Sequence, residues 1–362
     1  MCYTQNRFKA LLSACVLSLI ATAGWSQSLT WPGFLPGGYD SYPADVSADG
    51  VVVGQARNAA GLQRAFRWTA SGGMQDLGTL GGSDSRATGV SADGAVVVGY
   101  AFNAQQQLRA FRWTASGGMQ DLGTLGGNWS YAYGVSADGT VVVGWAHNAA
   151  RQPRAFRWTA GGGMQDLGTL GGTLSEAFGV TADGAVVVGG ADNAAGFYRA
   201  FRWTASGGMQ NLGTLPGYDW SDARGVSADG VVVGRSFYPG GDSRAFRWTA
   251  LGGMEDLNTT YASLLTNGSA LRSASAISPD GRYIVGEGYN AATGRYEAFL
   301  LDTWRVGDTN GDGCVNDADL LAVLSAFGSA GTGDARHEDI NKDGIVDDAD
   351  LLIVLFNFGS GC

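Results

Sequence analysis

The chain has 362 residues and a net charge of −10, of which −8 lies in residues 305–362, where eleven acidic residues face three basic ones. This acidic balance argues against nucleic acid as a partner, because nucleic-acid interfaces are built from basic patches. The apolar fraction of 45% is sufficient for a folded core, and the 59 glycines recur at regular intervals, which indicates turns rather than disorder.

The N-terminus has the features of a secretory signal peptide. Arg7 and Lys9 precede an apolar run over residues 10–23 that ends in a small-residue cleavage motif. The run is too short to stay in a bilayer, so we expect residues 1–26 to be removed, the protein to be extracellular, and no span to remain in the membrane. An alternative, a lipoprotein box ending at Cys15, has a short apolar stretch before it.

Residues 29–302 repeat with a period close to 45. The motif AFRW begins at Ala65, Ala110, Ala155, Ala200 and Ala245. Each repeat contains four short strand-like runs separated by turn residues, as in 87–91, 95–100, 109–114 and 119–125, and none has helical spacing. Four antiparallel strands per repeat of about 40–50 residues are typical of a β-propeller blade.

The two ends of the repeat region predict how the propeller closes. Residues 29–38 resemble the end of a repeat, whereas the sixth repeat stops before its fourth strand. We therefore expect residues 29–35 to pair with residues 297–301, which would close a six-bladed all-β propeller over residues 27–304. The segment 258–274 departs from the repeat and is expected to hold a short helix over residues 260–265.

The third and fourth strand-like runs predict a hairpin. With a turn at residues 70–73, Arg67 lies opposite Asp76, and Arg112 opposite Asp121. Such cross-strand pairs contribute roughly 0.2–1 kcal/mol each and fix the register. A register shifted by one residue remains open.

The motifs SADG, VVVG, AFRW and GGMQDLGTLGG together resemble the bacterial extracellular HAF repeat family over residues 29–302. The SPDG turn of the sixth repeat is similar, more loosely, to turns of the WD-repeat-like propellers. These resemblances imply a propeller fold and no particular activity.

Two acidic stretches, residues 308–319 and 339–350, each fit a twelve-residue calcium loop, with oxygen ligands at positions 1, 3, 5, 9 and 12, a glycine at position 6 and a backbone carbonyl at position 7. Hard oxygen ligands at this spacing suit Ca²⁺, and two ions are expected. The expected ligands are Asp308, Asn310, Asp312, Cys314, Asn316 and Asp319 in the first loop and Asp339, Asn341, Asp343, Ile345, Asp347 and Asp350 in the second.

Each calcium loop leads into an apolar helix, over residues 319–327 and 350–358. This duplicated unit, with Asp at position 12, resembles the type I dockerin domain, an EF-hand-like α-helical fold, over residues 305–362. The resemblance implies a cohesin-like protein or a cell-surface component as the partner, and a link to polysaccharide breakdown. Cys314 and Cys362 are expected to form a disulfide in an exported chain, with two free thiols as the alternative.

No catalytic motif is present, and the repeated aspartates lie in tight turns where they can bond their own backbone. Two families of connections vary freely between repeats, and they carry aromatic side chains that can stack on sugars or anchor proteins. These candidate ligand-binding residues are Tyr39, Tyr42, Trp129, Tyr131, Tyr133, Trp145, Phe178, Tyr218, Trp220 and Tyr238. We expect a secreted, non-catalytic protein that binds protein or carbohydrate. The alternatives are a glycoside hydrolase or other polysaccharide-degrading component with its active site on this face, and a purely structural scaffold in which these connections merely drift.

Overall fold

The computed structural model describes residues 29–238, 241–265, 267–311, 314–331 and 337–360. The expected signal peptide, residues 1–26, lies outside them. Phe34–Cys362 form one compact unit, which contains the strands and helices of the described residues. Among the residues that the structure describes, no helix combines the length and apolar character needed to cross a membrane.

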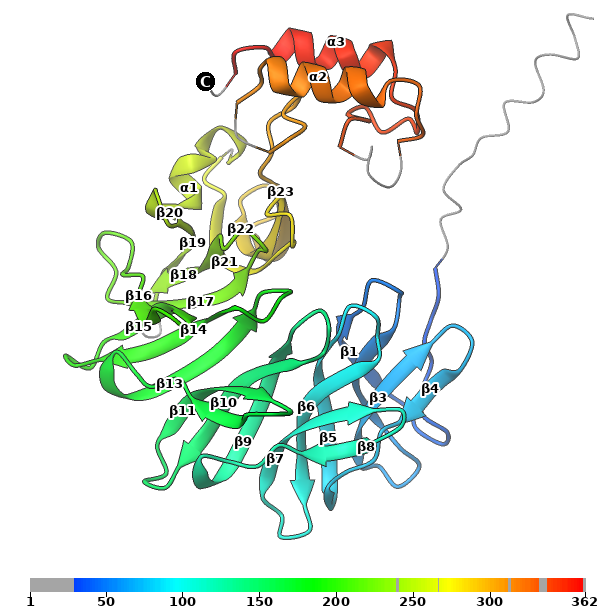
Figure 1. Cartoon of the computed structure of the whole chain (residues 1–362), viewed down its shortest axis with the longest axis vertical. Coiled ribbons are helices and arrows are strands. Elements are labelled where there is room, and N and C mark those ends of the chain that lie inside the picture. Colours follow the sequence, from blue (N-terminus) through cyan, green and yellow to red (C-terminus); the bar gives the residue numbers. More distant parts are fainter. Residues whose placement is uncertain (1–28, 239–240, 266, 312–313, 332–336, 361–362) are drawn as a thin grey trace, which may run out of the picture. The chain divides into compact units, whose positions relative to one another are not determined.

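The fold is the predicted six-bladed all-β propeller (Figure 1), in which each blade is an antiparallel sheet whose strands follow sequence order. Blade one consists of β1 (Ser41–Val46), β2 (Val52–Arg57), β3 (Gln63–Thr69) and β4 (Gly73–Asp76). Blade two consists of β5 (Gly81–Val90), β6 (Val96–Asn103), β7 (Leu108–Thr114) and β8 (Gly118–Asp121). Blade three consists of β9 (Gly126–Val135), β10 (Val141–Asn148), β11 (Pro153–Thr159) and β12 (Gly163–Asp166). Blade four consists of β13 (Gly171–Val180), β14 (Val186–Asn193), β15 (Tyr198–Thr204) and β16 (Gly208–Asn211). Blade five consists of β17 (Trp220–Val226), β18 (Val232–Phe237), β19 (Ser243–Thr249) and β20 (Gly253–Asp256). Blade six consists of β21 (Ala270–Ile277), β22 (Tyr283–Asn290) and β23 (Arg295–Asp302).

The SADG turns hold neighbouring blades together as well as reversing the chain. Asp93 accepts hydrogen bonds from the Ser91 hydroxyl (2.6 Å) and from the backbone N–H of Ala95 (3.0 Å), as expected for a turn aspartate. The hydroxyl bond is the main reason that the pKa of Asp93 is lowered. The N–H of Ala92 donates to the carbonyl of Ala137 in the next blade at 3.0 Å. This end of each blade is therefore fixed by contacts between blades, which explains why the motif varies so little from repeat to repeat.

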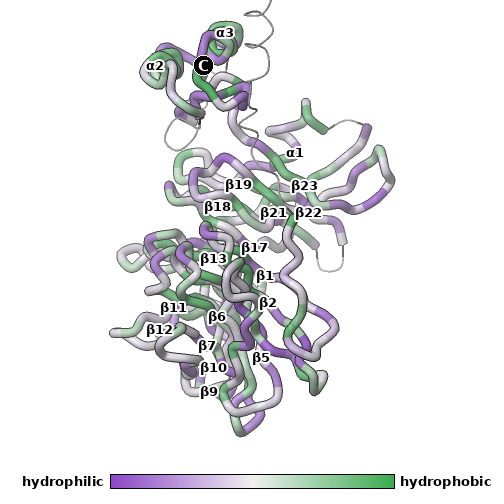
Figure 2. The backbone as a smooth tube through the Cα atoms, turned by 90° about the vertical axis from the view of Figure 1, so that its right-hand side faces the viewer, coloured by the Kyte–Doolittle hydropathy of each residue, from purple (hydrophilic) through white to green (hydrophobic). Residues whose placement is uncertain are grey.

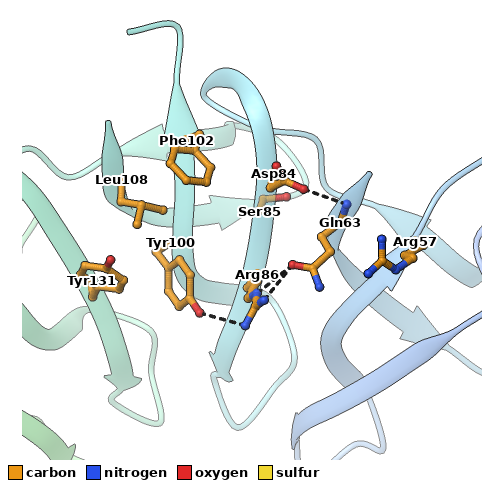
Figure 3. A pocket seen from close by; sticks show the side chains of 9 residues that line it. All are labelled: Arg57, Gln63, Asp84, Ser85, Arg86, Tyr100, Phe102, Leu108 and Tyr131. Carbon is orange, nitrogen blue, oxygen red and sulfur yellow. Dashed lines mark hydrogen bonds between the residues drawn. The ribbon is translucent and has the colours of Figure 1, made fainter. Parts of the chain in front are cut away.

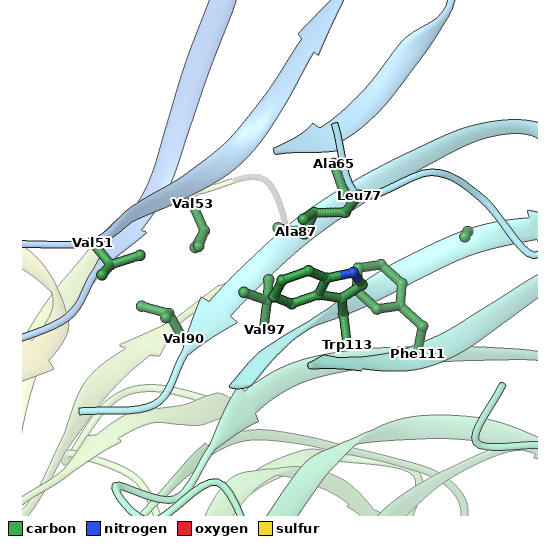
Figure 4. Close-up of a cluster of buried hydrophobic side chains, with 10 residues drawn as sticks. Val51, Val53, Ala65, Leu77, Ala87, Val90, Val97, Phe111 and Trp113 are labelled. Atoms are coloured by element: carbon green, nitrogen blue, oxygen red, sulfur yellow. The ribbon is translucent and has the colours of Figure 1, made fainter. Parts of the chain in front are cut away.

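The hydrophobic core lies between successive blades. Figure 4 shows one such layer, in which side chains of blade one meet side chains of blade two. Phe111 is fully buried there and Trp113 is 5% exposed. The β-branched run VVVG supplies the second strand of the layer, because alternate residues of a strand face the two neighbouring blades. Four further layers repeat this packing.

The predicted hairpin register is wrong by one residue. Phe66 lies opposite Asp76, and Arg67 lies opposite Gln75. The turn has three residues, 70–72, and the next residue, Gly73, has a φ of +67°, which suits a three-residue hairpin loop. Arg67, the arginine of the recurring AFRW motif, instead donates from Nε to the carbonyl of Gly94 in the next blade at 2.8 Å. The cross-strand ion pair is made by the arginine before the motif, Arg64, with Asp76 at 3.7 Å.

The predicted closing strand is also not formed. Residues 29–38 contain no strand, and β23 pairs only with β22 among the described residues. Leu35 does occupy the place of a repeat-end leucine, because it is 2% exposed and packs on Ala56 and Phe66 of blade one. The inner strands contact one another in order from β1 to β21, but no comparable contact joins β21 to β1 within the described part of the chain. Val285 of blade six is accordingly 41% exposed, whereas its counterpart Val98 is fully buried.

The described residues also contain three short α-helices and a 3₁₀ turn, of which one helix and the turn follow blade five and two helices lie in the C-terminal repeats. The insertion forms α1 (Leu257–Thr260) and a 3₁₀ turn at Ala262–Leu264, in place of a single helix over residues 260–265. The calcium-loop segments lead into α2 (Asp317–Ala326) and α3 (Asp348–Asn357), which begin two residues earlier than expected because Asn316 and Asp347 cap them. Both helices carry hydrophobic residues (Figure 2).

The two C-terminal repeats pack as related halves. Val315, Val323, Val346 and Val354 are fully buried and form the centre of a small core. Val315, at position 8 of the first loop, exchanges backbone hydrogen bonds of 2.8 and 2.9 Å with the residues that follow α3, and Val346 does the same with the residues that follow α2, at 2.8 and 3.0 Å. Each half therefore completes the other.

Candidate functional site

Every blade carries a β-bulge in its first strand at the same place. In blade three, Val143 lies opposite Gly134 and Gly144 opposite Ala132, so that Tyr133 is the extra residue. The glycine is required there, because a Cβ on Gly144 would overlap the carbonyl oxygen of Tyr131. Bulges redirect side chains and often border functional sites. The bulged residues are Ala44, Thr88, Tyr133, Phe178, Arg224 and Ser275.

Next to the bulge lies a cross-strand pair that differs in every blade. It is formed by the residue after the VVVG-type glycine and the residue opposite it in the first strand. The six pairs are Tyr42–Gln55, Arg86–Tyr100, Tyr131–Trp145, Glu176–Gly190, Asp222–Arg235 and Ser273–Glu287. The surrounding sequence repeats closely, so the chemistry that distinguishes the blades is concentrated at these pairs and bulges.

The pairs of blades two and three touch through aromatic rings. The centroids of Tyr100 and Tyr131 lie 4.9 Å apart, and Tyr131 stacks on Trp145 at 4.5 Å. The indole N–H of Trp145 donates to the hydroxyl of the bulged Tyr133 at 3.0 Å. His147 extends this set of rings, because it contacts Trp145 at 5.3 Å and stacks on Trp129 at 5.4 Å. Aromatic contacts thus run without a break across two blades.

The same line of contacts continues into blades four and five. Tyr133 meets Phe178 at 5.8 Å, and the guanidinium of Arg224 lies 5.7 Å from the Phe178 ring centre. Arg224 and Arg235 both bond to Asp222, with Nε–oxygen distances of 2.8 and 3.0 Å, and the Asp222 carboxylate is only 3% exposed. We call this continuous set the variable row; it comprises Arg86, Tyr100, Tyr131, Tyr133, Trp145, Phe178, Asp222, Arg224 and Arg235.

Glu176 lies beside the variable row and has an altered pKa. Burial raises the pKa of its carboxyl, the hydrogen bond from the Tyr198 hydroxyl (3.1 Å) lowers it, and the Asp222 charge raises it further. The charges of Arg224 and Asp192 make smaller contributions of opposite sign. The net effect is a folded-state pKa above the ordinary value of 4.5.

This pKa shift predicts how Glu176 affects stability. Because the folded state holds the proton more tightly than the unfolded state, the free energy of unfolding falls as pH rises from about 4.5 through the raised pKa. Glu176→Gln keeps an acceptor for Tyr198 and removes the charge. We expect the variant to be more stable than wild type at pH 7.5 and similar at pH 4. Urea unfolding at the two pH values measures this; equal stability at both would contradict the prediction.

A cavity of about 560 Å³ opens at the other end of the variable row, where blades one, two and three meet (Figure 3). This volume falls within the range of small-ligand sites, ~300–1,000 Å³. Its walls combine aromatic, charged and amide side chains. The lining residues are Arg57, Gln63, Asp84, Ser85, Arg86, Tyr100, Phe102, Leu108 and Tyr131.

The aromatic residues singled out from the sequence are only partly gathered, and most lie in strands rather than in loops. The first strands of blades two to four are ten residues long and begin at the glycines that precede the variable segment. The variable segment is therefore part of a strand in these blades. Tyr42, Trp129, Tyr131, Tyr133, Trp145, Phe178 and Trp220 lie in strands, and Tyr39, Tyr218 and Tyr238 lie in connections. Tyr218 and Tyr238 form a separate contact at 5.2 Å, and Trp220 packs near Phe237 at 5.8 Å. Sequence reasoning missed Arg86 and Asp222 of the variable row and the neighbouring Glu176, which a comparison of the six repeats at one position would have found.

The calcium-loop residues lie in the described segments, apart from Asp312. Asp319 and Asp350 are fully buried and accept backbone N–H bonds, such as those from Thr309 at 2.8 Å and Ile340 at 2.6 Å. Asp339 is 5% exposed; one oxygen accepts from the N–H of Gly344 at 3.0 Å, and the other is buried without a hydrogen-bond donor.

An orphaned, buried carboxylate oxygen at loop position 1 fits a cation. Within the described residues, no three His, Cys, Asp or Glu side chains converge as a metal-binding group.

Cys314 is disulfide-bonded. Its predicted partner, Cys362, lies outside the described residues, so the Cys314–Cys362 pairing stays a prediction.

The sequence matches no protein-family model, and no curated protein is similar to it. Among solved structures, TolB from Acinetobacter baumannii is 15% identical with a TM-score of 0.42, over 59% of this chain and 53% of that one, so the match spans about half of TolB. An acylaminoacyl peptidase from Pyrococcus horikoshii is 10% identical with a TM-score of 0.47, over 73% of this chain and 45% of that one. The β-propeller domain of the Trilobed protease from Pyrococcus furiosus, described as having an open velcro topology, is 10% identical with a TM-score of 0.38, over 73% of this chain and 96% of that one.

Proposed function

We propose that this protein is secreted and non-catalytic, and that its propeller binds a polysaccharide through the variable row. The observation that carries the proposal is the unbroken contact of non-repeating side chains across blades two to five on a scaffold that otherwise repeats closely. Random sequence variation between the repeats would change the side chains at these positions but would not be expected to bring them into contact with one another. Aromatic rings such as Tyr131 and Trp145 suit the apolar faces of sugars, and the charged members suit hydroxyl groups.

Alanine variants test the polysaccharide-binding proposal. Trp129 is 44% exposed and lies at the outer edge of the aromatic contacts, so Trp129→Ala is expected to weaken glycan binding while leaving the melting temperature unchanged. Tyr131→Ala should also weaken it, with a modest loss of stability, because the Tyr131 ring is half-buried. A glycan array followed by calorimetry on the full chain gives the affinities. If Trp129→Ala unfolds the protein, or if no glycan binds, the proposal fails.

We further propose that residues 305–362 bind two Ca²⁺ ions and attach the protein to a cohesin-like partner or the cell surface. The orphaned oxygen of Asp339 supports the metal, which when bound would neutralise the loop carboxylates. The helices support the partner, because corresponding positions of the two repeats expose leucines. These are Leu321 (64%) and Leu352 (49%), followed by Leu324 (49%) and Leu355 (48%). Exposed apolar side chains in matched positions favour a docking surface.

Glycoside hydrolysis is the second candidate, favoured by the raised pKa of Glu176, which suits a general acid. Asp222 is the carboxylate whose charge acts most strongly on Glu176, but it already bonds two arginines through both of its oxygens. It is poorly placed to attack a sugar, so we rank binding first. Release of reducing ends by wild type and not by Glu176→Gln would reverse this order.

A further inference from the structure

Arg86 differs from the other arginines near the variable row in having no acidic partner. Arg224 and Arg235 share Asp222, and Arg57 pairs with Asp40 at 3.3 Å. Within the described part of the chain, Arg86 forms no ion pair, although it is half-buried in the wall of the cavity. A partly desolvated charge without a counter-charge favours an anionic ligand.

The guanidinium of Arg86 is held in a fixed orientation by neutral groups (Figure 3). Its Nε and Nη2 donate to the side-chain oxygen of Gln63 at 3.1 and 2.8 Å, and Nη1 donates to the Tyr100 hydroxyl at 3.5 Å. A guanidinium has five N–H donors, so one N–H on each terminal nitrogen has no protein acceptor among the described residues. Two such donors match the two oxygens of a carboxylate.

The rest of the cavity points to a hydroxylated ring rather than to a simple anion. Tyr100, Tyr131 and Phe102 supply aromatic walls. Asp84, whose Oδ1 accepts from the Gln63 backbone at 3.0 Å, places a negative charge in the same cavity. That charge disfavours doubly charged anions such as inorganic phosphate or sulfate more than a singly charged carboxylate, and Asp84 can accept hydrogen bonds from ligand hydroxyls.

We propose that this cavity binds a uronic-acid residue of an acidic polysaccharide, with the ligand carboxylate on Arg86, its hydroxyls near Asp84 and its ring against the tyrosines. This proposal deepens the proposed function, on which it rests, by naming the class of ligand. It places the anion-binding group in blade two, while the polysaccharide-binding proposal needs only the variable row as a whole.

Calorimetry on the full chain tests the assignment with trimers of galacturonate, glucuronate and mannuronate, each compared with its neutral methyl ester. We expect at least one acidic trimer to bind more tightly than its ester. Arg86→Gln should weaken that binding about tenfold or more, because a hydrogen bond to a charged group is lost. Arg86→Lys should also weaken it, since an ammonium does not present the paired N–H groups.

Arg295→Gln is the matched control, because Arg295 is exposed in β23 of blade six and its loss changes the net charge equally. It should leave the affinity unchanged, and the melting temperatures of all variants show whether they fold. Equal affinity for acid and ester, no effect of Arg86→Gln, or binding of hexaglutamate in place of every uronate would overturn the uronate assignment. Neutral glycan binding that depends on Tyr131 but not on Arg86 would overturn it while leaving the proposed function intact.

Discussion

Removal of calcium with EGTA is expected to unfold residues 306–362 and to leave the propeller folded, which gives two separate melting transitions. Eleven acidic residues lie in residues 305–362, and Asp308, Asp319, Asp339 and Asp350 are almost completely buried. Without a cation their mutual repulsion and desolvation oppose folding. The valine core between α2 and α3 is small and offers little stability of its own.

Circular dichroism at the helical wavelengths, with and without EGTA, measures the loss. Asp308→Ala combined with Asp339→Ala should reproduce the EGTA result in the presence of calcium. Reduction of the disulfide at Cys314 should lower calcium affinity, because a bridge to Cys362 would stabilise this region by about 4 kcal/mol. Helical signal that survives both EGTA and reduction would disprove the calcium proposal.

Gly144→Ala is expected to destabilise the propeller by about 3 kcal/mol, the upper end of the range for overpacking. The added methyl group would overlap the backbone carbonyl of Tyr131, which cannot move without shifting the bulge at Tyr133. The same substitution should therefore also weaken ligand binding in molecules that remain folded, because it displaces Tyr131 and Trp145.

Gly161→Ala is the control within the same blade. Gly161 lies in the hairpin turn, a Cβ there would meet no heavy atom within 4 Å, and its φ is not in the left-handed region. We expect its free energy of unfolding to stay within about 0.5 kcal/mol of wild type. Urea unfolding of both variants decides the matter; equal stability of the two would show that the close approach at Gly144 does not constrain the blade.

The number of blades, the strand order and the two loop-and-helix repeats could all be predicted from the amino-acid sequence. These features depend on local patterns: the VVVG run requires a buried strand, Asp93 with Gly94 specifies a tight turn, and the spacing of the glycines sets the repeat length. Such signals lie within a few residues of one another, so they can be read without knowing what packs against them.

Three features could not be predicted in this way: the hairpin register, the lack of a strand in residues 29–38 and the set of side chains that meet at the site. The register follows from the left-handed conformation of Gly73, which permits a three-residue turn. The N-terminal segment contributes Leu35 to the core instead of a strand, since one buried side chain does not require backbone pairing.

The variable row joins side chains about 45 residues apart, such as Arg86 and Tyr131, whose proximity depends on the stacking of blades. The charge of Arg86 was visible in the sequence. Its lack of an acidic partner was not, because that depends on which neighbours the fold brings to it.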